Sequence, residues 1–195
     1  ISAGPGIDEI KTEYGHAIDW ISSFIDSSSI EIDINHIYKN DSFDESKYDA
    51  WIITGSAYSV NDDDNWIDLL KNKIVYAYNH SIPILGICFG HQIISSALGG
   101  KVVENKKGWE LGSYHIEINK YGKNHKIFKN IDSDDYFYFS HQDVVKQLPS
   151  NAIELAKNNM GLQSFSINDI IFGIQFHPEF SVQVMEKYVE VRYNK

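Results

Sequence analysis

The sequence predicts an α/β fold with a mostly parallel, open sheet flanked by helices. Strand-like and helix-like stretches alternate along the chain, which is typical of this class. Residues 50–54 and 82–87 are short apolar stretches of strand length, and each runs into a glycine turn. Between them, Trp66, Leu70 and Ile74 recur at helical spacing, with Leu69 alongside.

The remaining elements follow from local patterns. Residues 1–3 are expected to be the remnant of a first strand, and residues 14–25 a helix. Isoleucines alternate with polar residues from Ile30 to Ile34, as in a half-exposed strand. Beyond Gly100 the chain is richer in β-structure, with strands expected at residues 101–104, 113–118 and 136–140. Ser181 is expected to cap the last helix at its N-terminus.

Length and composition favour one domain over residues 1–195, because the chain can bury a sizeable core but has no room for two average domains. The net charge of −10 argues against a nucleic-acid partner, since phosphate binding requires clustered Lys and Arg. No apolar stretch approaches membrane-spanning length, so no membrane partner is expected. The single cysteine permits no internal disulfide and fits a reducing compartment, so we expect a cytoplasmic location. The chain begins at Ile1 rather than Met, which leaves open what precedes it.

Residues 86–92, Gly-Ile-Cys-Phe-Gly-His-Gln, carry the strongest functional signal. A buried strand, a sharp Gly-x-Cys-x-Gly turn and a helix together predict a nucleophile elbow with Cys88 in the serine position. The glycines allow a tight backbone bend, and the start of the helix favours a thiolate. The alternative is a buried core cysteine at a strand end. That alternative explains neither the flanking glycines nor the motif that follows downstream.

The downstream motif is His177-Pro178-Glu179. Pro178 favours an extended conformation for His177, and residues two apart in an extended chain point the same way. The Glu179 carboxylate can therefore lie beside the His177 imidazole. A cysteine nucleophile, a histidine base and a carboxylate that orients the base are the parts of a catalytic triad.

The elbow and the late His-Pro-Glu together resemble the class I glutamine amidotransferases of the triad type. The likeness extends to residues 50–56, which resemble the family's strand and glycine turn, and to residues 140–143. It implies a flavodoxin-like fold and an enzyme that releases ammonia from glutamine, with no cofactor and no metal site. The implied roles are Cys88 as nucleophile, His177 as base, Glu179 as its orienter, the N–H groups of Gly55 and Phe89 as the oxyanion hole, and Gln92, Ser140, His141 and Gln142 as substrate-binding residues.

Within that family the chain is similar to stand-alone, GMP-synthase-glutaminase-like members. Residues 108–112 and Phe180 differ from the Arg-Glu-Tyr-Gly and the valine that usually occupy these places in the glutaminase domain of GMP synthase. Three functions remain open. One is a glutaminase that supplies ammonia to a separate synthetase or other acceptor subunit, and another is a hydrolase of γ-glutamyl peptides. The third is a catalytically silent regulatory module, which the presence of all three triad residues disfavours.

Overall fold

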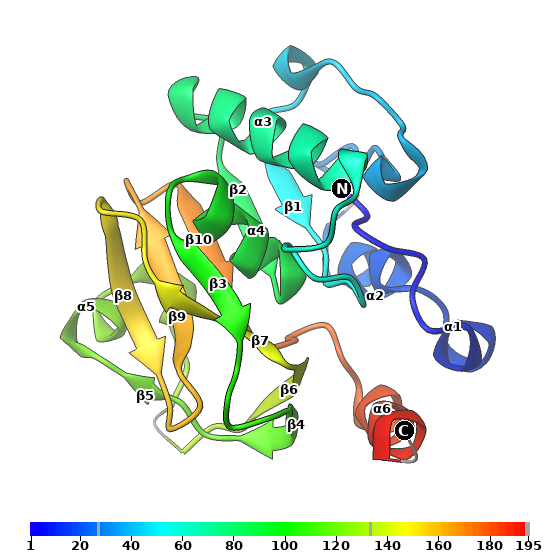
Figure 1. The fold of residues 1–195 in the computed structure, drawn as a ribbon, viewed down its shortest axis with the longest axis vertical. Helices are drawn as coiled ribbons and strands as arrows, with labels where there is room; N and C mark the ends of the chain where they lie inside the picture. The colour runs from blue at the N-terminus through cyan, green and yellow to red at the C-terminus, as the bar shows by residue number, and fades with distance from the viewer. Residues whose placement is uncertain (27, 133, 194–195) are drawn as a thin grey trace.

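The structure, a computed structural model, describes residues 1–26, 28–132 and 134–193. A six-stranded sheet forms its centre, and two two-stranded sheets flank it (Figure 1). The central order is β1 (Trp51–Ile53), β2 (Ile84–Ile87), β10 (Ile171–Ile174), β9 (Leu162–Ile167), β8 (Ala152–Lys157) and β5 (Glu117–Ile118). The smaller sheets pair β3 (Lys101–Glu104) with β7 (Asp143–Gln147) and β4 (Glu110–Tyr114) with β6 (Phe137–His141).

The central sheet has a parallel half and an antiparallel half. β1 and β10 both run parallel to β2, whereas β9, β8 and β5 pair with their neighbours antiparallel. A parallel pair needs a crossover connection, which the helix between β1 and β2 supplies, while short turns suffice for β8, β9 and β10. The expected α/β class with its helix-flanked sheet is confirmed, and the parallel pairs lie in the half that carries the cysteine motif.

Helices cover both the sheet and one of its ends. The α-helices are α1 (Asp8–Tyr14), α2 (Ala17–Ser23), α3 (Asn65–Asn79), α4 (Phe89–Ala97), α5 (Lys120–Lys123) and α6 (Val182–Tyr193). Short 3-10 turns are η1 (Ile37–Lys39), η2 (Glu45–Lys47) and η3 (Lys126–Phe128). None of the helices in the described ranges is long and apolar enough to cross a membrane.

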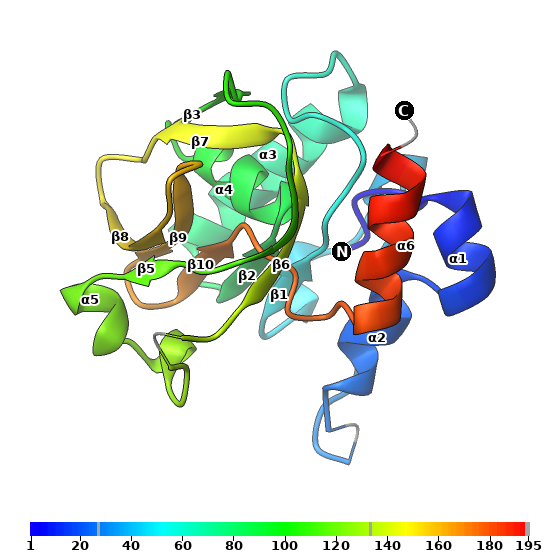
Figure 2. The ribbon, with the colours of Figure 1, turned by 90° about the horizontal axis from the view of Figure 1, so that it is seen from below.

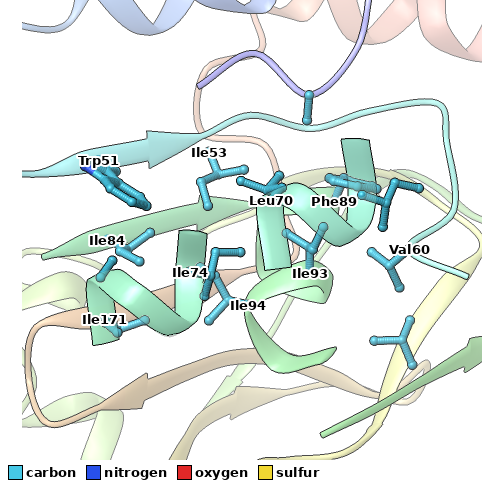
Figure 3. Close-up of a cluster of buried hydrophobic side chains, with 14 of the residues drawn as sticks. Trp51, Ile53, Val60, Leu70, Ile74, Ile84, Phe89, Ile93, Ile94 and Ile171 are labelled. Carbon is cyan, nitrogen blue, oxygen red and sulfur yellow. The ribbon is translucent and has the colours of Figure 1, made fainter. Parts of the chain in front are cut away.

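The main core lies between the parallel strands and helices α3 and α4. Figure 3 shows isoleucines from β1, β2 and β10 facing the apolar sides of α3 and α4. Leu70 and Ile74 of α3 and Ile93 of α4 are fully buried there, at the helical spacing expected from the sequence. This packing fixes the strand ends from which the functional turns emerge.

Helix α6 closes one end of the molecule. It lies beside α1 (Figure 2), and Ile10 of α1 forms a buried apolar cluster with Val184 and Met185 of α6. The predicted N-cap is confirmed, because the Ser181 hydroxyl oxygen accepts a hydrogen bond from the Val184 amide at 3.2 Å. The N-terminal and C-terminal segments are thereby joined over the carboxyl end of the parallel strands.

The predicted helix over residues 14–25 is wrong at its start. A separate helix, α1, precedes this segment and ends at Gly15, whose φ is 81°. The sequence patterns did not indicate α1. A new helix, α2, then begins at Ala17, where the His16 side chain accepts a hydrogen bond from the Ile18 amide and Asp19 accepts one from the His16 amide. This reciprocal capping sets the helix start independently of the apolar pattern.

The strand predicted around Ile30, Ile32 and Ile34 is also wrong. Residues 30–35 form no strand, and the three isoleucines are 39–53% exposed. They line a groove of about 360 Å³ beside β1 instead of packing in a sheet. Only one bridge, between Ser2 and His36, joins this segment to the expected first strand at residues 1–3. An alternating pattern makes a strand only where a neighbouring backbone pairs along its length.

Candidate active site

Cys88 lies in a strained turn between β2 and α4. Its φ of 52° is unusual for a residue other than glycine, and its side chain is buried at the start of α4. A Cβ on Gly86 would overlap the backbone of Gly90, and a Cβ on Gly90 would overlap the carbonyl of Ile53. The glycines of the motif are therefore required because α4 packs directly on β1 and β2.

The parallel pairing of β2 and β10 brings His177 to Cys88. The Cys88 amide donates a hydrogen bond to the Ile174 carbonyl at 2.8 Å, which aligns the two strand ends. Three residues beyond Ile174, the His177 amide donates to the Tyr138 carbonyl at 2.8 Å. Motifs that are far apart in sequence thus meet at the carboxyl edge of the sheet, where open α/β folds bind ligands.

His177 lies between a carboxylate and a thiol. Its Nδ1 donates to Oε1 of Glu179 at 2.8 Å, and both side chains are buried. Nε2 of His177 and Oε2 of Glu179 have no hydrogen-bond partner among the described residues. Burial opposes a charge on the imidazole, but the Glu179 carboxylate and the Cys88 thiolate outweigh it and raise the pKa of His177 to about 10. These surroundings therefore favour the imidazolium form of His177 beside the Cys88 sulfur.

Gly55, in the turn after β1, completes this corner. A Cβ at Gly55 would lie 3.0 Å from Cε1 of His177 and 3.5 Å from Cβ of Cys88. The turn can approach both residues because position 55 has no side chain. Within the described chain, the amides of Gly55 and Phe89 donate no hydrogen bond to another residue. Two N–H groups are thus available on either side of the thiol.

Of the four expected substrate-binding residues, only Ser140 lines the pocket at Cys88. This cavity of about 40 Å³ is formed by the turns around Gly55 and Cys88, by the segment from His177 to Phe180, and by residues of α1, α2 and α6. The Ser140 hydroxyl is buried there without a hydrogen-bond partner in the described structure.

The side chains of Gln92, His141 and Gln142 bond within the protein instead. The Gln92 amide donates to the Asp143 carbonyl at 2.8 Å and to Gln175 at 3.1 Å. Gln142 donates to Glu104 at 2.6 Å, on the exposed side. Direct side-chain contact between these residues and a substrate stays a prediction.

His141 belongs to a buried polar network behind Ser140. Its Nε2 lies 3.0 Å from Oε2 of Glu110, while its Nδ1 faces the Asp143 carbonyl at 3.0 Å. The amides of Asn158 and Gln163 also donate to the Glu110 carboxylate. This network links β4, β6 and β9 and fixes the backbone at Ser140.

The structure adds pocket residues that the sequence motifs did not indicate. They come from α1, α2 and α6, and include Trp20, Tyr188 and Arg192. No local motif connects them with Cys88, because helix packing alone brings them there. One signal was available, since Arg192 is the only arginine in the chain.

No group of three His, Cys, Asp or Glu side chains in the described ranges has the arrangement needed to hold a metal ion. Cys88, the imidazole of His177 and the amides of Gly55 and Phe89, which donate to no other described residue, lie together at this edge of the sheet. A family model named "Glutamine amidotransferase class-I" matches residues 15–192. The chain belongs to the class I glutamine amidotransferase family.

Curated relatives of this class I glutamine amidotransferase have different names. A glutamine amidotransferase-like protein of Schizosaccharomyces pombe is 30% identical over 208 residues, covering 98% of this chain and 82% of that protein. Gamma-glutamyl peptidase 3 of Arabidopsis thaliana is 35% identical over 156 residues, covering 77% of this chain and 62% of that protein. One subunit of the glutamine-hydrolyzing GMP synthase of Methanococcus vannielii is 40% identical over 107 residues, covering 54% of each chain. The chain thus spans less than two thirds of the length of the latter two.

The fold agrees with solved members of the class. The crystal structure of a glutamine amidotransferase from Methylobacillus flagellatus matches with a TM-score of 0.78. The match covers 90% of this chain and 69% of the other, at 19% sequence identity. A likeness at this identity supports the fold alone.

Proposed function

We propose that this amidotransferase domain hydrolyses the side-chain amide of glutamine through a triad of Cys88, His177 and Glu179. The observation that carries the proposal is the imidazole of His177, held by Glu179 on one nitrogen and open toward Cys88 on the other. The Glu179 carboxylate and the Cys88 sulfur also raise the pKa of His177 to about 10, and a strongly shifted pKa beside a pocket is typical of functional sites. The whole chain, residues 1–195, serves as one glutaminase domain in this proposal.

The first half of the reaction forms a thioester. The Cys88 thiolate attacks the carboxamide carbon of glutamine, and the carbonyl oxygen takes up negative charge. The amides of Gly55 and Phe89 are proposed to hold this oxyanion. As the C–N bond breaks, His177 gives its proton to the departing nitrogen, which leaves as ammonia. The products of this half are ammonia, a γ-glutamyl thioester and a neutral imidazole.

The second half releases glutamate. Neutral His177 takes a proton from a water molecule, and the resulting hydroxide attacks the thioester carbon. The C–S bond breaks, glutamate leaves, and the thiolate and imidazolium are restored. Glu179 keeps the Nδ1 proton of His177 in place throughout, so that Nε2 alone exchanges protons with the reactants.

Ser140 is proposed to bind the glutamine head group with its unpaired hydroxyl. Gln92, His141 and Gln142 are proposed to support this subsite, since they fix the backbone around it. The ammonia is proposed to pass to a separate synthetase subunit. The similarity to one subunit of a GMP synthase supports such a division between two chains.

A second candidate function is the hydrolysis of γ-glutamyl peptides by the same triad. The similarity to gamma-glutamyl peptidase 3 favours it. Incubation of the purified chain with glutamine and, separately, with a γ-glutamyl dipeptide decides between the two when glutamate release is followed. Faster turnover of the dipeptide would select the peptidase. If neither substrate releases glutamate, both enzymatic functions are contradicted, and the catalytically silent regulatory module is the function that remains.

A further inference from the structure

Arg192 places a positive charge in the pocket that holds Cys88. It lies in the last turn of α6, and its side chain lines this pocket together with Cys88 and Ser140. Within the described part of the chain, no carboxylate, carbonyl or hydroxyl accepts a hydrogen bond from the guanidinium. Nε of Arg192 is buried without a partner. A buried donor without an acceptor is rare in folded proteins, and one that lines a pocket is available to a ligand.

Apart from His177, whose imidazole faces Cys88, the other basic side chains at this pocket already have partners. Lys11 bonds the carboxylate of Asp8 at 2.9 Å. His16 uses Nε2 toward the Gly4 carbonyl at 3.0 Å and Nδ1 toward the Ile18 amide at 3.3 Å. Besides His177, Arg192 is therefore the basic side chain at the pocket whose donors have no acceptor among the described residues.

Aromatic rings fix the position of Arg192 but leave its donors available. The guanidinium lies 4.3 Å from the ring centroid of Trp109 and 5.8 Å from that of Tyr188. Stacking of this kind uses the flat faces of the guanidinium, whereas its N–H groups point outward in the plane. Burial lowers the pKa of Arg192, which shows that the charge is partly removed from water. Such a preoriented, partly desolvated fork suits a carboxylate.

We propose that Arg192 determines substrate specificity by binding a carboxylate of the γ-glutamyl substrate. This inference rests on the proposed function, which assigns the pocket at Cys88 to γ-glutamyl compounds. Glutamine offers one carboxylate, on its α-carbon, and a γ-glutamyl peptide offers that group and a second one at its C-terminus. The shared chemistry is a carboxylate of the substrate within reach of Arg192 in this pocket.

The central experiment compares two variants on α6 that lose one positive charge each. Arg192→Gln removes the guanidinium from the pocket, whereas Lys187→Gln removes a charge that pairs with Glu190 at 3.0 Å outside it. Because a hydrogen bond to a charged group contributes about 1.5–3 kcal/mol, Arg192→Gln should raise KM by about tenfold to a hundredfold. We expect kcat to change less than KM, Arg192→Lys to recover part of the loss, and Lys187→Gln to behave as wild type. Unchanged KM in Arg192→Gln would overturn the inference.

Substrate analogues identify which carboxylate is bound. Glutamine with its α-carboxylate converted to an amide tests the first source. A γ-glutamyl-glycine and γ-glutamyl-glycinamide pair tests the second. The wild type should discriminate against the uncharged analogue of the bound group, and Arg192→Gln should lose that discrimination. If Arg192→Gln retains the discrimination of the wild type against both analogues, the guanidinium does not bind either carboxylate.

Direct binding separates this inference from the proposed function. In a Cys88→Ala background, calorimetry with glutamine and with γ-glutamyl-glycine measures affinity without turnover. If the wild type hydrolyses neither compound but binding occurs and is lost in Arg192→Gln, the proposed function fails and the inference holds. If the wild type is active and binding is unaffected by Arg192→Gln, the inference fails alone. Absence of binding in the Cys88→Ala background also overturns it. The Arg192 and Lys187 variants should unfold at the same temperature, which would exclude destabilisation of α6 as the cause of a change in KM.

Discussion

The phenyl ring of Phe180 stacks on the imidazole of His177, with ring centroids 4.0 Å apart and planes 12° from parallel. Tyr188 of α6 stacks on Phe180 in turn at 4.7 Å, and Trp20 of α2 meets Phe180 edge-on at 5.6 Å. The expected base of the triad is thus packed against two helices at the end of the sheet. These rings hold the imidazole plane in the one orientation that serves both Glu179 and Cys88.

Replacing Phe180 should therefore impair catalysis more than folding. Phe180→Leu retains an apolar side chain but loses the stacking, which is worth about 0.5–1.5 kcal/mol for an aromatic pair. We expect kcat to fall by about tenfold, because small displacements of a catalytic group are costly. Steady-state kinetics beside a thermal unfolding curve provides the check. Full activity in a folded Phe180→Leu protein would show that the stack does not orient His177.

Cys88→Ala should abolish hydrolysis while the fold is retained. Alanine adds no bulk to the strained turn and removes the sulfur that would carry the γ-glutamyl group. Intact-protein mass spectrometry after rapid acid quenching should show the γ-glutamyl adduct on the wild type only. Undiminished glutamate release by the folded variant would contradict the assignment of the nucleophile.

His177→Ala and Glu179→Ala should differ in the size of their effects. Removing His177 eliminates both proton transfers, whereas removing Glu179 leaves an imidazole that still acts from a less favourable pose. We expect the larger loss of kcat for His177→Ala. Equal or reversed losses, with unfolding curves matched, would mean that the two roles are wrongly assigned.

The pH dependence should report the raised pKa of His177. Its ordinary value is 6.5, and burial is outweighed by Glu179 and Cys88, which raise the pKa to about 10. The imidazolium that is proposed to protonate the departing amide nitrogen should therefore persist at neutral pH and disappear as pH rises toward 10. The associated contribution to stability is complete below pH 6.5 and is lost over the same window, because the folded state binds the proton more tightly than the unfolded state.

Glu179→Gln should move this basic limb to lower pH, since the charge that favours the imidazolium is gone. Rate profiles of kcat/KM for both proteins provide the comparison, and the triad is treated as one coupled titration. If the basic limb of the profile is the same in Glu179→Gln as in the wild type, the Glu179 carboxylate is not the cause of the raised pKa of His177.

Glutamine turnover by the isolated chain should be slow, and an acceptor subunit should raise it. The Gly55 peptide is free to rotate because glycine tolerates many backbone conformations, so an oxyanion donor can be lost without a partner that fixes it. Steady-state assays with and without the candidate synthetase measure the effect. Rapid cleavage of a γ-glutamyl peptide, unaffected by added protein and with glutamine a poor substrate, would instead support the peptidase.

The close approach of Cys88, His177 and Glu179 was predictable because each of the two motifs has a local backbone consequence. Glycines around Cys88 specify a tight turn, and Pro178 specifies an extended neighbour, so short motifs indicate where the side chains point. The strands β1 and β2, which precede the turns at Gly55 and Cys88, were likewise visible as apolar runs. The order β1-β2-β10 then supplies the contact that the motifs need.

Other parts could not be predicted from one sequence. β8 and β9 form a hairpin of mixed polarity, and β9 is buried throughout although it contains Ser164 and Ser166. The isoleucines at 30–34 carry the same alternation as a strand, and only the missing neighbour distinguishes them. Arg192 reaches the pocket through helix packing, which leaves no trace in the local pattern.

The glycine contacts around the candidate active site distinguish a tightly packed segment, at Cys88, from a less tightly packed one, at Gly55. Gly86 and Gly90 bring α4 so close to β1 and β2 that the backbone carrying Cys88 has no room to shift. The packing at Gly55 is looser, since a Cβ added there would lie 3.5 Å from Cβ of Cys88 and 3.0 Å from Cε1 of His177. We therefore expect control of this site to act on the turn at Gly55 and to leave the sulfur of Cys88 in place. Ligands or partners that change the rate should alter the amide environment of Gly55, while Cys88 reports the same position in every state.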